Sequence, residues 1–409
     1  MVFPFFRSRL PFPNTRLSRN PVTTFVNRYH DYVRFATPGG SGRIPLHNPK
    51  ILGVANSRGD RPYQEDFYSY SALSLNPEEL KLSLKKAHHI NWDYHHLPES
   101  IARQVLFVGI YDGHGGSAVA QFLRQELHGM FENVNKSHIP ELYAWAREID
   151  GYFRRFKGGV LAPWVKPDEP EAQTEMDLEA RATLAFFEVD KTLYHESSAQ
   201  ECGATASVAL LHSIDDPSIP FFASKRVALT VAHVGDTRVL LTQTHNGKVV
   251  PMTEHHHPDA RVEAVRLRRM MGSGLITDSF GEVRWMGALA NTRSLGDLKY
   301  KPLGVTPEPD VRTMLLEGQS YSHVTLISDG ISSVVSDEEI SDLARAARTP
   351  QDAARRILSF AEQMGSEDNL TALVIPLSGW GRITGDDATR ELREYRAKNM
   401  EGSERQRRM

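Results

Sequence analysis

The stretch VLFVGIYDGHGG, residues 105–116, decides the fold of this chain. Residues 105–111 form an almost uninterrupted apolar run, which is typical of a strand that is buried on both faces between other layers. Asp112 and His114 follow at once, among glycines that allow a sharp turn and a close approach of the backbone to a ligand. Residues 117–128 then return to the apolar spacing of a helix. The stretch predicts a strand-to-helix turn that presents a carboxylate and an imidazole; a tight turn with Asp112 as a simple helix cap is the alternative.

Length and composition describe a chain with room for a large core. Its 409 residues are 40% hydrophobic, which is typical of a globular protein. Cys202 is the only cysteine, which excludes an intramolecular disulfide. No window approaches the ~18 apolar residues that a membrane-spanning helix needs, so we expect no stable membrane insertion.

The start of the chain differs in charge from the rest. Six arginines, no lysine and the single acid Asp31 give residues 1–37 a formal charge of +5, so the remainder carries −8. This composition is typical of a mitochondrial transit peptide with processing near Arg34, and predicts a matrix protein. A basic tail that contacts anionic membranes or acidic partners is the alternative. A GGSG joint at 39–42 predicts a flexible linker over residues 38–50, and the acidic body argues against nucleic-acid binding.

Residues 51–377 are predicted to form one folded domain with two insertions. The segment 74–104 is helical, charged and rich in histidine, and the segment 132–180 is heterogeneous, so both are expected at the surface. The histidines of the first insertion lack cysteine partners and the spacing of a zinc site, which favours surface roles. Residues 378–409 carry charges of mixed sign, with REYRAK at 393–398 able to form a helix, and are predicted to be a solvated tail.

Three further segments carry local signals. The small-residue run GATASVALL at 203–211 predicts a strand suited to close packing. The segment VALTVAHVGDTRVLL at 227–241 alternates on both sides of Gly235 and Asp236, which predicts a hairpin. Adjacent histidines rarely converge on one ion, so TEHHHP at 253–258 is interpreted as a hydrogen-bonding loop.

Four carboxylates lie at predicted strand ends or turns: Asp66, Asp112, Asp329 and Asp368. Each one alone is most often a cap or turn residue. Together they would repel one another unless cations offset their charge, and an all-oxygen set favours Mg²⁺ or Mn²⁺ over zinc. Two such ions about 3.5 to 4 Å apart would hold a bridging water as hydroxide for in-line attack on phosphorus.

Cleavage of a phosphate ester also needs a cation that holds the phosphate and an acid that protonates the leaving group. Arg61 is the candidate for the bidentate grip on the phosphate oxygens. A local ion pair of Arg61 with Glu65 and Asp66 is the alternative. His114 is placed to protonate the serine or threonine alkoxide that leaves.

Seven motifs, in this order, resemble those of the metal-dependent protein phosphatases, the type 2C serine/threonine phosphatase family: RPYQEDF, DGHGG, GATAS, VGDTR, LANTRSLGD, LISDG and SEDNLT. The resemblance spans residues 51–377. It implies an α+β fold, an αββα sandwich in which two antiparallel sheets pack face to face between helices. It also implies a metal-dependent enzyme acting on phosphoserine and phosphothreonine of protein substrates, with Arg61 holding the phosphate and His114 as general acid.

The resemblance also implies a set of metal ligands for two ions, Mg²⁺ or Mn²⁺. Asp112 would bridge both ions, and the backbone carbonyl of Gly113 would bind one of them. Asp329 and Asp368 would complete the shell of one ion. The acids of the QED motif, Glu65 and Asp66, would support the other ion, largely through water.

One departure from the family pattern concerns a third metal. Asp236, in VGDTR, matches a position that the family links to a weaker third ion. The family commonly places an acid three residues after the glycine of LISDG, whereas this chain has the neutral Ser333 there. This departure puts a third site in question, while the two-metal set is intact. The segment 255–296 resembles the family's flap and is expected to shape substrate choice.

Two other classes of function compete with the phosphatase. A catalytically inactive scaffold that binds partners through its insertions is the main alternative, but a scaffold has no physical need to hold Arg61 and four aspartates together. A metal-dependent nuclease would need a basic groove, which the acidic body disfavours. Mitochondrial members of the family include enzymes that act on the pyruvate dehydrogenase complex, so its E1 subunit is a candidate substrate by analogy. Oligomeric state and regulators are not predicted.

Overall fold

The computed structural model describes residues 31–37, 40–215, 219–269, 275–277, 281 and 283–400. Most of the predicted transit peptide and the last residues of the predicted tail lie outside these ranges. Within them, the structure contains no helix of sufficient length and apolar character to cross a bilayer.

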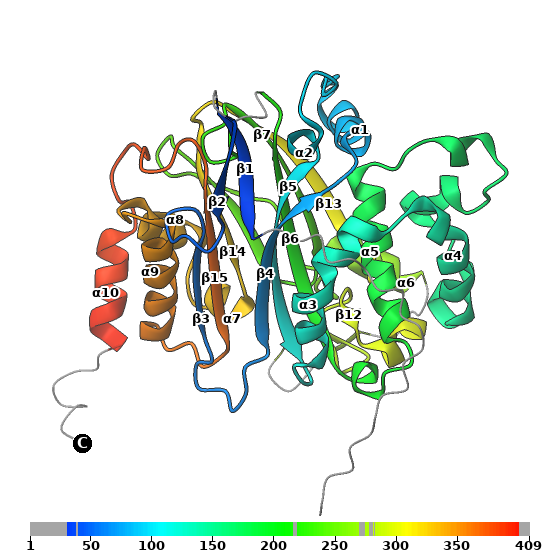
Figure 1. Cartoon of the computed structure of the whole chain (residues 1–409). Coiled ribbons are helices and arrows are strands. Elements are labelled where there is room, and N and C mark those ends of the chain that lie inside the picture. Colours follow the sequence, from blue (N-terminus) through cyan, green and yellow to red (C-terminus); the bar gives the residue numbers. More distant parts are fainter. Residues whose placement is uncertain are drawn as a thin grey trace, which may run out of the picture.

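Two antiparallel sheets pack face to face (Figure 1). The six-stranded sheet runs in the order β13 (Asp310–Glu317), β7 (Arg226–Val234), β6 (Gly203–Ser213), β5 (Gln104–His114) and β4 (Asp66–Ser74), and β12 (Leu295–Gly296) pairs with β6. The five-stranded sheet runs in the order β3 (Gly53–Ser57), β15 (Leu370–Pro376), β14 (Tyr321–Ile327), β8 (Arg238–Gln243) and β9 (Val249–Pro251). Two hairpins, β1 (Tyr32–Thr37) with β2 (Gly40–Pro45) and β10 (Leu275–Thr277) with β11 (Val283–Trp285), stand outside the two sheets.

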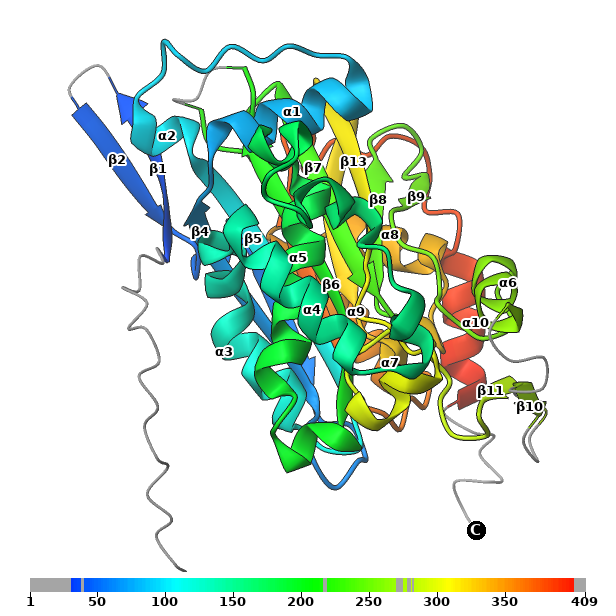
Figure 2. The ribbon, with the colours of Figure 1, turned by 90° about the vertical axis from the view of Figure 1, so that its right-hand side faces the viewer.

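Helices cover the outer face of each sheet (Figures 1 and 2). The α-helices are α1 (Pro77–His88), α2 (Glu99–Ala102), α3 (Ala118–Asn133), α4 (Ile139–Glu148), α5 (Leu178–Leu193), α6 (Arg261–Arg268), α7 (Asp329–Ser332), α8 (Asp337–Arg345), α9 (Pro350–Gln363) and α10 (Arg390–Met400). Short 3₁₀ turns are η1 (Lys136–His138), η2 (Gly151–Arg155), η3 (Gly159–Trp164), η4 (Pro170–Gln173), η5 (Ser197–Gln200) and η6 (Leu298–Leu303). The helices α3 and α5 pack on the six-stranded sheet, and α8 and α9 pack on the five-stranded one. The structure therefore confirms the αββα sandwich and the α+β class.

The apolar run at the start of β5 has a simple explanation in these layers. Side chains alternate across a strand, so Val105 and Phe107 enter the core under α3 and α5. Leu106 and Val108 enter the core between the two sheets. Both faces of the strand are therefore covered, as the sequence predicts for such a run.

The structure extends this strand further than the sequence predicts. β5 continues through Asp112 and Gly113 to His114, with Asp112 opposite Asp66 of β4 and His114 opposite Gly203 of β6. Asp112 and His114 are two residues apart on one strand, so they project from the same face of the sheet. The predicted turn thus begins after His114, at Gly115.

The predicted hairpin around Gly235 is wrong. β7 pairs with β6 and β13, whereas β8 pairs with β14 and β9, so the two strands belong to different sheets. The connection crosses from one sheet to the other, and Gly235 adopts a φ of +98° against the side chain of Thr205. Local alternation is the same in a hairpin and in such a crossover, so the sequence signal could not separate them.

The predicted flexible linker is wrong over β2, and the predicted transit peptide overlaps β1. The β1–β2 hairpin begins at Tyr32, and the side chain of Val33 is only 1% exposed within the core between the sheets. The backbone N–H of Arg34 donates to the side chain of Gln104 at 2.7 Å, which ties the hairpin to the start of β5. Burial of an apolar side chain and backbone pairing outweigh the flexible composition around GGSG.

The insertions and the tail contribute packing as well as surface. Residues of the 132–180 segment, including Leu142 and Phe153, are fully buried against α5. The tail forms α10 over the REYRAK stretch and none of the residues of this helix is buried, although Arg396 forms an ion pair with Glu339 of α8 at 2.6 Å and Ala397 packs against the core cluster that includes α9. A partner on α8 therefore holds a helix that buries none of its own residues.

Candidate active site

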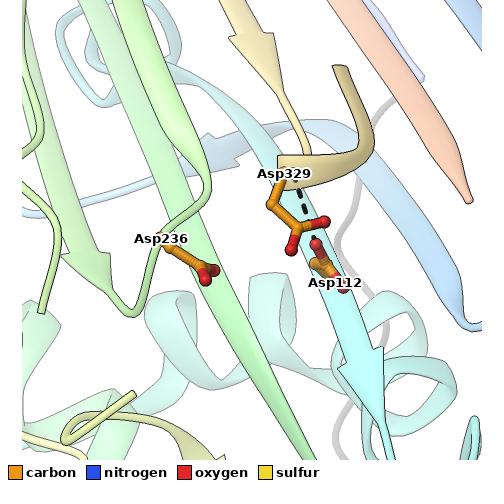
Figure 3. A group of neighbouring side chains, drawn as sticks. All are labelled: Asp112, Asp236 and Asp329. Atoms are coloured by element: carbon orange, nitrogen blue, oxygen red, sulfur yellow. Dashed lines mark hydrogen bonds between the residues drawn. The ribbon is translucent and has the colours of Figure 1, made fainter. Parts of the chain in front are cut away.

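Three carboxylates from three distant segments meet at one end of the sandwich (Figure 3). Asp112 lies near the end of β5, Asp236 lies in the crossover between β7 and β8, and Asp329 begins α7. One oxygen from each lies within 4.8 Å of the others. The backbone N–H of Asp329 also points to a carboxylate oxygen of Asp112 at 3.4 Å.

The cluster carries an uncompensated concentration of negative charge. Burial and the neighbouring charges of Asp329, Asp66 and Asp236 raise the pKa of Asp112 well above its ordinary value. Burial and Asp236 raise the pKa of Asp329 to about 7. Such shifts arise where acids are brought together without a counter-charge.

This donor set fits a hard divalent cation. The oxygens belong to carboxylates, no cysteine or histidine nitrogen takes part, and the acids are close enough to share an ion. A bound cation would offset the repulsion that raises these pKa values.

Gly113 allows β5 to approach the loop before β4 closely. Its backbone N–H donates to the carbonyl of Glu65 at 3.1 Å. A Cβ at this position would lie 2.7 Å from the same carbonyl oxygen and 3.1 Å from the side chain of Ala120. Only glycine therefore fits here without displacing the backbone that carries Glu65.

The two acids of the QED motif have different positions. Glu65 lines the cleft above the cluster, whereas Asp66 lies beneath it and is 2% exposed. The hydroxyl of Thr371 donates to Asp66 at 2.8 Å, and burial raises the pKa of Asp66 to about 6. Asp66 thus forms part of the floor that supports Asp112.

Arg61 lines the same cleft as the carboxylates. Its guanidinium donates to Asp368 at 2.7 Å, and the side chains of the pair are 55% and 37% exposed. Asp368, first by its hydrogen bond and then by its charge, raises the pKa of Arg61. The structure therefore pairs Arg61 with Asp368, where the sequence alternative had paired it with Glu65 and Asp66.

A neighbouring asparagine organises the loop that carries Arg61. The side-chain amide of Asn369 donates to the carbonyls of Arg58 and Tyr63, and its oxygen accepts from the N–H of Glu65 at 2.6 Å. The sequence analysis missed Asn369 as a site residue. Its place directly after Asp368 in the SEDNLT motif is the signal that could have identified it.

His114 is held by a buried acid that the sequence analysis also missed. Its Nε2 lies 2.8 Å from Asp297, which is 1% exposed and also accepts from Ser294 at 2.5 Å. Burial alone would lower the pKa of His114, but the charge and hydrogen bond of Asp297 outweigh burial and raise it. The last residue of LANTRSLGD is therefore part of the site.

A buried ion pair supports the turn that carries Asp297. Lys301 lies 2.7 Å from Asp190 of α5, and both side chains are 1% exposed. Lys301 also donates to the carbonyl of Ser294 at 2.7 Å, while Asp190 accepts from the N–H of Gly296 at 2.8 Å. The turn is therefore fixed at both ends against α5.

The predicted site residues, apart from the buried Asp66, line one cleft of about 660 Å³. Its lining includes Arg61, Glu65, Asp112, His114, Asp236, Asp329 and Asp368. The flap contributes Asn291, whose amide donates to Asp236 at 2.8 Å. The structure thus brings the predicted site residues together at one place, with Asp66 just below the surface.

The two residues that bear on a third metal lie in different surroundings. Asp236 lies within the central cluster, with one carboxylate oxygen within 4.8 Å of an oxygen of Asp112 and of Asp329. The hydroxyl of Ser333 donates to the carbonyl of Gly330 at 3.3 Å and supplies no carboxylate. The histidine loop also has the predicted role, because His256 accepts from the N–H of Gly235 and contacts Asp310.

Comparison with known proteins identifies the family. The family model of protein phosphatase 2C matches residues 151–370, more than half of the chain. The chain belongs to the protein phosphatase 2C family. Members of this family are metal-dependent serine/threonine phosphatases. This chain is therefore a protein phosphatase, an enzyme that acts on phosphoproteins.

Individual relatives agree with this assignment. Protein phosphatase 2C homolog 4 of Schizosaccharomyces pombe is 32% identical over 377 residues, which are 89% of this chain and 91% of the relative. A mitochondrial protein phosphatase 1K of Xenopus laevis is 30% identical over 68% of this chain and 62% of its own length. A solved serine-threonine phosphatase 2C of Toxoplasma gondii shares the fold, with a TM-score of 0.52, 17% identity and coverage of 80% of this chain and 94% of that one.

Proposed function

We propose that this phosphatase binds Mg²⁺ or Mn²⁺ at the Asp112, Asp236 and Asp329 cluster and hydrolyses phosphoserine and phosphothreonine esters in the adjoining cleft. The single observation that carries this proposal is the meeting of three half-buried carboxylates from distant segments in that cleft, with one oxygen of each within 4.8 Å of the others. Gly113, Glu65, Asp66 and Asp368 surround the cluster and would complete its binding of two ions.

The metal ions, Arg61 and His114 would each have a separate role in the reaction. Bound divalent cations would supply Lewis acidity and an activated water at neutral pH. Arg61 would bind the phosphate, because its exposed guanidinium has five N–H donors and the described residues use one of them, for Asp368. His114 would donate its proton to the leaving alkoxide, and Asp297 would orient the ring and favour the protonated form.

The experiment is phosphate release from a phosphothreonine peptide, titrated with Mn²⁺ and Mg²⁺ and compared with a chelator. We expect turnover that requires metal and is lost in Asp329→Asn, with the fold retained by circular dichroism. Glu367→Gln is the matched control, because Glu367 is a charged neighbour of Asp368 that is not among the cleft-lining residues. Absence of turnover in folded wild-type protein with either ion would instead support the inactive scaffold.

We further propose that the protein acts in the mitochondrial matrix, with the E1 subunit of the pyruvate dehydrogenase complex as a candidate substrate. The arginine-rich start of the chain supports this location, as do two relatives, from Xenopus laevis and Oryza sativa, whose names call them mitochondrial. Because β1 begins at Tyr32, we place the end of the transit peptide before that residue.

Two measurements test the location and the substrate separately. A reporter fused to residues 1–31 is expected to enter mitochondria, and a cytosolic reporter would contradict the location. Purified phosphatase is expected to restore the activity of the phosphorylated complex, and unchanged phosphorylation would remove that substrate.

A further inference from the structure

A second hollow lies outside the catalytic cleft, between the 150–159 segment and α6. This basic groove has a volume of about 1290 Å³ and is defined by the basic side chains along its two walls: Arg154, Arg155 and Lys157 on one, Arg261 and Arg269 on the other. The floor includes Pro302. Figure 2 shows α6 on the flank of the molecule, near the β10–β11 hairpin.

The five basic side chains of the groove are exposed. None of them forms an ion pair or side-chain hydrogen bond with a residue that the structure describes. The acidic side chains among the lining residues are only two, Asp150 and Glu308, and a further arginine, Arg266, is already bound to Glu263. This local positive excess contrasts with the chain's formal charge of −3.

The first wall is rigidly built, although its segment is an insertion. Phe153 is 1% exposed and packs against Phe187 of α5, and Phe156 stacks on the same ring at 5.3 Å. These anchors leave the intervening arginines facing outward. Gly151, with a φ of +55°, lets the backbone approach Pro302 so closely that a Cβ would lie 2.2 Å from its carbonyl oxygen.

The second wall combines charge with exposed apolar surface. Val262 is 66% exposed and Val265 is 44% exposed, and both line the groove beside Arg261 and Arg269. Neighbouring arginines would repel a cation, and an apolar ligand alone would leave them without a counter-charge. The wall therefore favours a ligand that carries both carboxylates and apolar side chains.

Two segments of the chain line both the basic groove and the catalytic cleft. His257 lines the cleft, and Arg261, four residues later, lines the groove. Asp297 lines the cleft, and Pro302, five residues later, lines the groove. A polypeptide bound in the groove would thus lie beside the place where its phosphate reacts.

We propose that the basic groove docks an acidic segment, interspersed with apolar residues, of the phosphoprotein substrate. Multiple acidic contacts would raise the encounter rate and lower KM for substrates with such a segment. A polynucleotide is disfavoured, because it offers no apolar side chains to the exposed Val262 and Val265. The substrate role rests on the proposed phosphatase function, whereas binding to the groove does not.

The first experiment measures binding without catalysis. The probe is a fluorescein-labelled, unphosphorylated peptide rich in Glu and Leu, titrated with full-length protein in chelator and followed by anisotropy. We expect Arg154→Glu/Arg155→Glu to weaken binding at least tenfold, and 0.5 M NaCl to weaken wild-type binding similarly. The matched control is Arg348→Glu/Arg355→Glu, which makes the same charge change at exposed positions on the α8–α9 side and should alter binding less than twofold.

A second variant, on the other wall of the groove, keeps the test decisive if the first variant does not fold. Arg261→Glu/Arg269→Glu should weaken binding to a similar extent, so loss in either folded variant supports the groove. Equal binding in both variants and the control would overturn the proposal. It would also be overturned if a single-stranded RNA or an anionic vesicle bound at this groove and the acidic peptide did not.

The second experiment separates docking from chemistry. Phosphothreonine peptides with an acidic or a glutamine-substituted extension are compared with p-nitrophenyl phosphate under saturating Mn²⁺. We expect Arg154→Glu/Arg155→Glu to raise KM for the acidic peptide about tenfold, with kcat and p-nitrophenyl phosphate turnover unchanged. Turnover without preference for the acidic extension would overturn docking alone, whereas peptide binding without any metal-dependent turnover would overturn the phosphatase proposal alone.

Discussion

Replacement of Lys301 by methionine tests the idea that a buried ion pair fixes the turn behind His114. Lys301 and Asp190 are 2.7 Å apart and 1% exposed, so Lys301→Met leaves a buried carboxylate without its counter-charge. Removal of one partner of a buried pair destabilises a protein by about 3–5 kcal/mol. We expect a loss of that size, because the remaining polar contact of Asp190, from the N–H of Gly296, cannot replace a full charge.

The loss should depend on pH in a defined direction. Burial raises the pKa of Asp190 to about 6 even though Lys301 opposes the shift, so without Lys301 the pKa of the folded state rises further. A carboxyl group whose pKa is higher in the folded than in the unfolded state destabilises the fold as pH rises above the unfolded value. Lys301→Met should therefore cost most at pH 8 and clearly less at pH 5, where the folded protein can protonate Asp190.

The assay is urea unfolding followed by tryptophan fluorescence at pH 5 and pH 8. Lys299→Met is the matched control, because Lys299 lies two residues away and forms an exposed pair with Glu201, so no measurable loss is expected. Asp190→Asn/Lys301→Met should recover most of the stability, since it removes both charges. A loss below about 1 kcal/mol, or an equal loss at the two pH values, would refute the reasoning.

Three further outcomes are expected. Asp297→Asn should move the basic limb of the kcat/KM profile to lower pH, because Asp297 raises the pKa of His114 and the general acid must be protonated; an unmoved limb would assign that limb to another group. Gly113→Ala should weaken Mn²⁺ binding, measured by calorimetry, because the new Cβ would push against the Glu65 carbonyl; unchanged affinity would show that the strands relax freely. Asn369→Ala should destabilise the protein by about 1–3 kcal/mol and raise KM, because three backbone groups of the Arg61 loop lose their partner; unchanged unfolding and KM would contradict that anchoring role.

The sequence by itself determined the elements whose signals are local. The run before Asp112 specified a strand covered on both faces, because only a layered sheet buries every side chain of such a run. Ser336 with Glu339 three residues later is the sequence pattern of a capping box, which predicts a helix start, and the structure forms both halves of this box at the start of α8. The ordered motifs located the carboxylates, Arg61 and His114, and these residues do line one cleft apart from the buried Asp66.

Only the tertiary structure decided features that depend on contacts between distant residues. The strands on either side of Gly235 entered different sheets, because pairing with β6 and β14 offers each strand its own partners. The place where the helix of the tail docks depends on such a contact, because Glu339 of α8 supplies a counter-charge for Arg396. Asp297 contacts His114, which is 183 residues away along the chain, and the turn that carries Asp297 is tied to α5. Local pattern fixes which face of an element is apolar, whereas long-range pairing and buried charge fix which elements meet.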